Sequence, residues 1–156
     1  MKISSLSPAS VSVDTSRRMS RQRTRDTGPE MLLRRELHRR GLRYRVDASL
    51  PGMPRRRADI LFTRAKVAVF VDGCFWHGCR EHKTAPTTNA PWWAAKLTRN
   101  VERDRETDGH LISMGWTVRR VWEHEDITHA AADIEQIVRG GRLCAAGFEA
   151  AASGED

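Results

Sequence analysis

The sequence predicts a single α/β domain in which helices flank a mixed central sheet. Its 156 residues suit one domain of ordinary size. Short apolar runs typical of strands stand on both sides of a long helical pattern that starts at Pro91 and ends before Gly115. A strand, a long helix and a second strand predict a right-handed crossover between parallel neighbours.

The N-terminal half of the domain predicts one helix followed by a strand. Thr27 is a typical cap residue, Pro29 suits the first turn and Gly41 is a typical helix stop, so we expect a helix over residues 29–40. Apolar and basic residues then alternate over residues 42–46, which predicts a half-buried strand. A proline-rich loop is expected at residues 50–54.

The middle of the chain predicts a β-hairpin. Residues 59–62 and 67–71 are short apolar runs separated by a polar turn. The second run is apolar at every position, which is typical of a strand with both faces buried. We therefore expect residues 67–71 to form a central strand.

The C-terminal half predicts the crossover partner and a last helix. A strand is expected over residues 116–122, followed by a helix that Thr128 caps and that continues past Val138. Residues 1–16 and 141–156 are rich in small and polar residues and are expected to be flexible tails. The folded domain should therefore span residues 17–140.

Basic residues are concentrated in one segment. The whole chain carries a net charge of +7, but residues 17–57 hold 14 arginines, no lysine and four acidic residues, a net charge of +10. Guanidinium groups bind phosphate oxygens through paired hydrogen bonds, so the segment is a candidate for contact with a nucleic-acid backbone. The alternative is a solvated basic face without a ligand.

A group of cysteines and histidines predicts a structural zinc site. Cys74, Cys79 and His82 stand within nine positions, and structural zinc takes four Cys or His ligands. His124 is the best candidate for the fourth ligand because it follows the strand expected beside the one that ends near Cys74, and His77 is a competitor. Thiols and surface imidazoles without a shared ligand are the alternative. We expect Cys144, in the tail, to have no role.

A second group of polar residues predicts a catalytic centre. Asp59 opens an apolar strand, and the next strand ends at Val71 and Asp72 shortly before His77. A carboxylate, a backbone carbonyl and several waters form a usual cradle for magnesium at a phosphate. Asp104, on the apolar side of the long helix, would need a hydrogen-bonding partner, and orienting His77 is one reason for its position. Asp59 could instead be a simple strand-end cap.

Several motifs together resemble one enzyme family. They are the run GCFWHGC at residues 73–79, the NVERD run at residues 100–104 and the strand that leads into Trp122, Glu123 and His124. In this order, and with Arg25, Asp26, Thr27 and Glu30 upstream, they resemble the very short patch repair (Vsr) endonucleases over about residues 17–140. The resemblance implies a restriction-endonuclease-like fold and cleavage of the T-containing strand at T:G mismatches left by deamination of 5-methylcytosine.

The resemblance also implies roles for individual residues. Asp59 and the Val71 carbonyl would hold Mg²⁺, Glu30 would steady a metal-bound water, and His77 would act as general base with Asp104 as its orienter. The structural Zn²⁺ would be bound by Cys74, Cys79, His82 and His124. Residues 17–28 would form a basic arm that embraces the DNA and contains Met19, and the aromatic wedges beside the mismatch would be Phe75, Trp76 and Trp93.

The sequence-based hypothesis is therefore a magnesium-dependent endonuclease that nicks 5′ of the T in a T:G mismatch. We expect a cytoplasmic, nucleoid-associated monomer, since no long apolar run or secretory signal is visible. Its expected partner is mismatched double-stranded DNA, and mismatch-repair proteins are candidate partners. Two alternatives are a zinc-stapled DNA-binding module without chemistry and a nuclease of the same fold that cuts unmismatched DNA.

Overall fold

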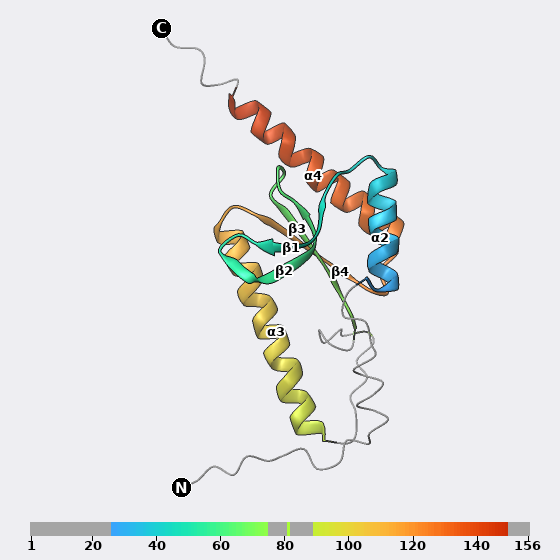
Figure 1. Ribbon diagram of the computed structural model, residues 1–156, viewed down its shortest axis with the longest axis vertical. Coiled ribbons are helices and arrows are strands. Elements are labelled where there is room, and N and C mark those ends of the chain that lie inside the picture. Colours follow the sequence, from blue (N-terminus) through green and yellow to red (C-terminus); the bar gives the residue numbers. More distant parts are fainter. Residues whose placement is uncertain (1–25, 75–80, 82–88, 150–156) are drawn as a thin grey trace.

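The protein is an α/β domain with three layers. The computed structural model describes residues 26–74, 81 and 89–149. Helices α2 (Gly28–Arg39) and α4 (Ile127–Glu149) cover one face of the sheet, and α3 (Ala90–Ser113) lies against the other (Figure 1). Within the described part of the chain, no helix is both long enough and apolar enough to cross a membrane.

The sheet has four strands in the order β1-β2-β3-β4. The β1–β2 and β2–β3 pairs are antiparallel, and β3 and β4 are parallel. This arrangement confirms the mixed sheet, the central third strand and the crossover through the long helix. The strand bounds are Arg45–Leu50 for β1, Met53–Phe62 for β2, Val67–Asp72 for β3 and Thr117–Trp122 for β4.

The strand expected at residues 42–46 begins later than the sequence suggests, at Arg45. Leu42 belongs instead to the end of α2, where its N–H donates to the Leu37 carbonyl and the Gly41 N–H donates to His38. Gly41 has a φ of 79°, as a helix-ending glycine requires. The alternating pattern was misleading because Leu42 is buried by the helix cap and not by a strand.

The loop expected at residues 50–54 is a tight turn inside a longer hairpin. Leu50 pairs with Met53, and Gly52 lies at the turn with a φ of 74°. Pro followed by Gly is typical of a type II turn, in which the second central residue needs a positive φ. Strand β2 therefore starts at Met53 and carries the three arginines at residues 55–57 along its first half.

Two apolar clusters bury the two faces of the sheet. Strand β3 is almost completely buried, and Val67 and Val69 face the cluster under α2 and α4. Ala68 and Phe70 face the cluster on the α3 side, with Leu111 from that helix. The apolar run over residues 67–71 therefore reflects burial on both faces, as expected.

Helix α4 differs from the expectation at both ends. Its cap is Asp126 and not Thr128, because the Asp126 carboxylate accepts the His129 N–H at 2.8 Å. The helix then continues to Glu149, so residues 141–149 extend a helix where an irregular tail was expected.

Candidate active site and metal centres

The candidate active site lies where strands β2 and β3 separate. Their pairing ends at Ile60 and Val69, so the next residue of β2, Asp59, has no backbone partner position on β3. The Asp59 side chain bonds to β3 instead, because its Oδ2 accepts the Val71 N–H at 2.7 Å. The fork therefore brings the Asp59 carboxylate to the backbone N–H of Val71, the residue whose carbonyl is expected to hold magnesium with Asp59.

Other acids surround the fork. Burial raises the pKa of Asp59 to about 6; the Val71 N–H opposes the rise, and the charges of Glu30 and Asp72 add to it. Glu30 comes from the first turn of α2 and is buried, with Arg34 bound to its carboxylate. Arg34 also binds Asp26 at 2.7 Å. Glu30 is therefore near enough for its charge to act on Asp59, and its role at a metal-bound water stays a prediction.

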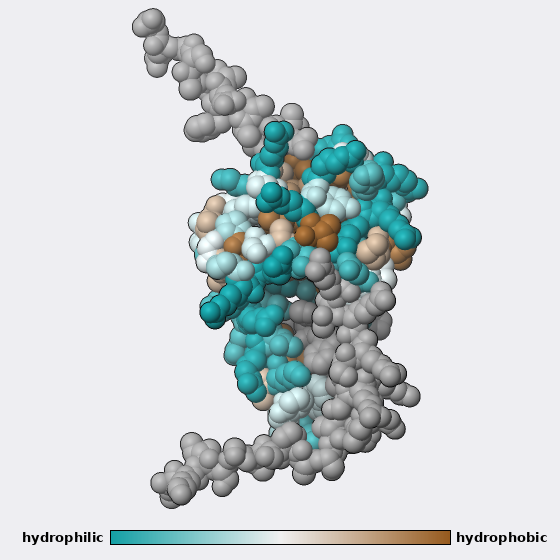
Figure 2. Space-filling model, viewed as in Figure 1, coloured by the Kyte–Doolittle hydropathy of each residue, from teal (hydrophilic) through white to brown (hydrophobic). Residues whose placement is uncertain are grey.

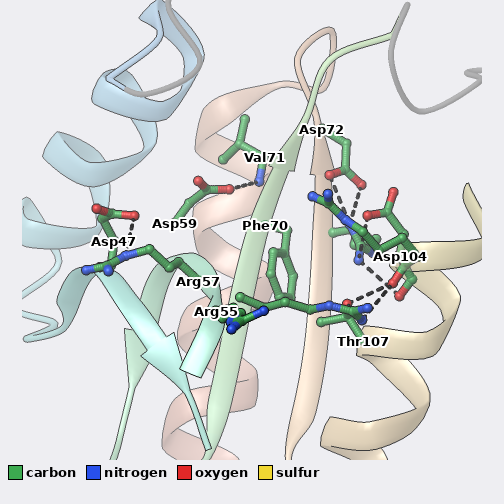
Figure 3. Close-up of a pocket in the computed structure, with 12 residues that line it drawn as sticks. Asp47, Arg55, Arg57, Asp59, Phe70, Val71, Asp72, Asp104 and Thr107 are labelled. Carbon is green, nitrogen blue, oxygen red and sulfur yellow. Dashed lines mark hydrogen bonds and ion pairs between the residues drawn. The ribbon is translucent and has the colours of Figure 1, made fainter. Parts of the chain in front are cut away.

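The fork opens into a cavity of about 550 Å³. Figure 3 shows Asp59 on one side of β3 and Asp72 and Asp104 on the other. Arginines from β2, α3 and β4 share the wall with these acids, so the cavity combines cation-binding and phosphate-binding groups. The lining arginines are Arg55, Arg56, Arg57, Arg103 and Arg120.

Some of these arginines are already engaged within the fold. Arg56 donates to Thr107 Oγ1 at 2.7 Å and to Glu106 Oε2 at 2.6 Å, which ties β2 to α3. Arg57 binds Asp47, a residue of β1, at 3.0 Å. Over its described part, the face in Figure 2 is mostly hydrophilic, with some apolar residues among the polar ones.

The acids on the α3 side converge on one guanidinium. Arg120 of β4 binds both oxygens of Asp72 at 3.0 Å and Asp108 Oδ1 at 2.7 Å. Its Nη2 also lies 3.6 Å from Asp104 Oδ1. Burial would lower the pKa of Arg120, but the Asp108 hydrogen bond and the charges of Asp72 and Asp104 outweigh it, and the pKa lies above its usual value. Sequence reasoning missed Arg120, although an arginine in the middle of a core strand was a visible signal.

Ionised Asp59 should destabilise the metal-free protein. Because its folded-state pKa of about 6 lies above the ordinary 3.8, folding favours the protonated acid. The protonated Asp59 therefore contributes to the free energy of unfolding. This contribution is complete below about pH 3.8 and is lost as the pH rises through 6. At pH 8 without added magnesium, we expect Asp59→Asn to be about 1–3 kcal/mol more stable than the parent.

Thermal unfolding measures this effect, as a Tm higher by about 3–8 °C in the variant. The amide oxygen of Asn can still accept the Val71 N–H, so the comparison changes mainly the charge. At pH 4 the gap should shrink, because Asp59 is then protonated in the folded protein. A variant that is less stable than the parent at pH 8 would contradict this assignment of the charge.

Two expected zinc ligands meet at the ends of β3 and β4. Cys74 Sγ lies 3.0 Å from His124 Nδ1. Two ligands of one tetrahedral zinc are about 3.5 Å apart, so a small shift would let this pair share an ion. The other expected ligands, Cys79 and His82, lie outside the described residues, as does the competitor His77. Among the described residues, no three His, Cys, Asp or Glu side chains form a group suited to a metal.

Neighbouring carboxylates hold the two zinc-ligand candidates in place. Glu123 Oε1 accepts the Cys74 N–H at 2.9 Å. Glu81 Oε2 lies 3.3 Å from His124 Nε2, the ring nitrogen that faces away from Cys74. Carboxylates on the second nitrogen of a histidine are typical of zinc sites. The chemistry of the pair and its neighbours therefore fits a structural zinc.

The aromatic residues expected to wedge into DNA are only partly within the described chain. Trp93 is buried, with 6% of its surface exposed, whereas Trp92 beside it is 39% exposed. Their rings meet edge to face, with centroids 4.8 Å apart, and Lys96 Nζ lies 4.9 Å from the Trp92 centroid. Contact between Trp93 and a duplex would thus require local movement. Phe75, Trp76 and Met19 lie outside the described residues.

Asp104 contacts Arg120. Its carboxylate lies near the guanidinium, and its backbone carbonyl accepts a 3.4 Å hydrogen bond from the same group. The expected partner, His77, is outside the described residues, so the orienting role stays a prediction. Asp104 lines the same cavity as Asp59.

Magnesium fits the residues at the fork. Mg²⁺ is usually bound by one or two carboxylates, with waters and substrate phosphates completing its shell. Asp59 supplies a carboxylate beside an open cavity, and the Glu30 and Asp72 charges that raise its pKa would be offset by a cation. The donor set therefore fits a hard divalent ion, with Asp59 and the Val71 carbonyl as the groups that would hold it.

Comparison with known proteins assigns the class. The family model of the DNA mismatch endonuclease Vsr matches residues 12–83. The type II nicking enzyme V.NaeI of Lentzea aerocolonigenes is 47% identical over 129 residues, 81% of this chain and 78% of its own. The type II nicking enzyme V.NmeDIP of Neisseria meningitidis serogroup C is 39% identical over 127 residues, 78% and 83% of the two chains.

The DNA mismatch endonuclease Vsr of Escherichia coli (strain K12) is 43% identical over 103 residues, 64% of this chain and 63% of its own. An acidic strand fork and these relatives define a DNA endonuclease. Within that class, the chain belongs to the Vsr family. Family membership implies the restriction-endonuclease-like fold expected from the sequence, and the α/β layers and mixed sheet agree with it.

Proposed function

We propose that this protein is a magnesium-dependent endonuclease that nicks the T-containing strand 5′ of the T in a T:G mismatch. The observation that carries the chemistry is Asp59 at the β2–β3 fork, bound to the Val71 N–H and open to the cavity. The mismatch specificity is supported by the match to the DNA mismatch endonuclease family.

The chain's own residues divide the work at the scissile phosphate. Asp59 and the Val71 carbonyl would hold magnesium, which would polarise the phosphate and stabilise the leaving 3′ oxygen. Glu30 steadies a water beside this position, and His77 takes a proton from the attacking water. The products are a 5′-phosphate and a 3′-hydroxyl. Arg55 and Arg103, in the cavity wall, are suited to bind the neighbouring phosphates.

Mismatch selectivity would come from deformability. A T:G wobble pair is less well stacked than a Watson–Crick pair, so distorting it costs less energy. Phe75, Trp76 and Trp93 are the aromatic residues that would convert this difference into selectivity by wedging beside the mismatch. The basic arm at residues 17–28, with Met19, would add affinity that does not depend on sequence.

A structural zinc completes the proposal. Cys74 and His124 lie at the ends of two parallel neighbours, so an ion shared with Cys79 and His82 would staple the loop after β3 to the end of β4. That staple would fix the segment that carries Phe75, Trp76 and His77. The zinc is thus proposed to support both folding and the position of the general base.

We expect the purified protein to contain one zinc per chain, and Cys74→Ser to lose metal and stability together. Metal analysis and thermal unfolding measure the two effects. Cys144→Ser is the matched control, because Cys144 is expected to have no role. A fully folded, metal-free Cys74→Ser protein with parental activity would contradict the zinc assignment.

Incubation with T:G, T:A and C:G duplexes, with and without magnesium, tests the proposed function. Nicking of the T:G duplex alone, and only with the metal, is the expected result. Binding without cleavage would favour the zinc-stapled DNA-binding module. Equal cleavage of all three duplexes would favour a nuclease for unmismatched DNA.

A further inference from the structure

Arg120 is in an unusual position for an arginine. It lies in the middle of β4, next to buried Val121, and stacks over the Phe70 ring at 4.6 Å between guanidinium and ring centroid. Its side chain lines the active-site cavity. An arginine here has lost part of its hydration, so its partners matter more than those of a surface ion pair.

The partners of Arg120 join β3 to α3. Asp72 is only 3% exposed and directs both of its carboxylate oxygens at Nη1, at 3.0 Å each. Asp108 accepts from Nε and Nη2 at 2.9 and 2.7 Å. Asp72 is the last residue of the strand that supplies the Val71 backbone. Arg120 therefore offsets part of the charge of an acid that directly follows Val71 in the chain.

The neighbouring arginine provides a natural comparison. Arg119 is also in β4 and is also held by acids, Glu125 at 2.8 Å and Asp133 of α4 at 3.4 Å. Successive side chains of a strand point to opposite faces of the sheet, so Arg119 and Arg120 point to opposite faces. Arg119 accordingly meets Asp133 of α4, the helix on the face opposite α3. Arg119 is therefore similar in chemistry and separate from the cavity.

We propose that Arg120 is a positioning residue that holds Asp72 on the α3 side of β3 and offsets part of its charge, so that Asp59 is the carboxylate that determines cation binding. This inference rests on the proposed magnesium site at Asp59. It assigns Asp72, which lines the cavity and directly follows Val71, to an ion pair with Arg120 instead of to the metal.

Electrostatics predicts effects of opposite sign for the two halves of the pair. Without Arg120, the charge of Asp72 is less compensated beside Asp59, so a divalent cation should bind more tightly. Without Asp72, the positive charge of Arg120 is less compensated, so the cation should bind more weakly. Each change should be about 3- to 10-fold, the size expected for one nearby charge partly screened by water and salt.

Mn²⁺ titration of the zinc-containing, DNA-free protein, followed by electron paramagnetic resonance, tests the inference. Asp59→Asn should remove the site. Arg120→Gln should tighten Mn²⁺ binding, Asp72→Asn should weaken it, and the double variant should return close to the parent. Arg119→Gln, the matched control, should leave the affinity unchanged. Loss of structure alone would weaken binding in both single variants, so opposite signs distinguish the electrostatic role.

The outcomes separate this inference from the proposed function. Mn²⁺ binding that Asp59→Asn leaves unchanged would overturn both. A site lost in Asp59→Asn, with Arg120→Gln and Asp72→Asn shifted in the same direction or not at all, would overturn only the role of Arg120. If Arg120→Gln does not fold, the weakening in Asp72→Asn and its reversal in the folded double variant decide the question.

Discussion

Asp59→Asn should reduce the rate of T:G nicking by at least about 10³-fold. The amide is close in size and can still accept the Val71 N–H, so the fork should keep its shape. It lacks the charge needed to hold magnesium at the phosphate, and the electrostatic stabilisation of the leaving oxygen is then lost. Binding of the T:G duplex should not weaken below the parental level. Without metal, the Asp59 carboxylate repels the phosphates, so its removal takes away no favourable contact with the DNA.

Single-turnover nicking and equilibrium binding on the same duplex separate these two effects. Asp47→Asn is the matched control, because Asp47 of β1 lines the same cavity but pairs with Arg57 of β2. Asp47 has a φ of 47°, a conformation that Asn also adopts readily. We expect the control to nick within about threefold of the parent, since it removes the partly exposed ion pair to Arg57 and leaves Asp59 unchanged. Parental nicking by Asp59→Asn would remove the basis of the metal assignment.

His77→Ala should lower the nicking rate by about 10²- to 10⁴-fold, the usual contribution of a general acid or base. In the sequence, His77 follows Asp72, the last residue of β3, by five positions. A neutral imidazole is needed to accept the proton, so the parental rate should rise with pH through about 6.5.

The pH–rate profile makes this prediction specific. The acidic limb should disappear in His77→Ala, whereas a variant that only disturbs the loop should keep it at a lower rate. His129→Ala is a suitable control, since His129 is an exposed residue of α4 near Asp133. A His77→Ala profile with the parental acidic limb would assign that limb to another group.

Much of the fold could be predicted because its signals are local. The run at residues 67–71 is apolar at every position, since β3 has neighbours and packed helices on both sides. The long helix before β4 required a parallel partner, and β3 is that partner. These features depend on burial and chain connectivity, which the order of residues expresses directly.

The structure differs from the sequence-based predictions where a residue pattern suits more than one kind of secondary structure. Leu42 alternates with its neighbours like a strand residue, but its N–H bonds the Leu37 carbonyl at the end of α2. The arginines at residues 55–57 lie in β2, which a Pro-Gly turn connects to β1. Asp59 could be predicted as a candidate catalytic residue because it directly precedes an apolar run. The pairing of Asp72 with Arg120 could not, because it joins residues 48 positions apart.

Strand-resolved cleavage of a T:G duplex tests the central claim most directly. Each strand carries its own 5′ label, and the parent protein acts on the T:G duplex and on a matched T:A duplex in magnesium. We predict one cut, in the T-containing strand immediately 5′ of the T, with the T:A duplex left intact on the same timescale. Cutting of both strands, or of the T:A duplex at the same rate, would contradict the account.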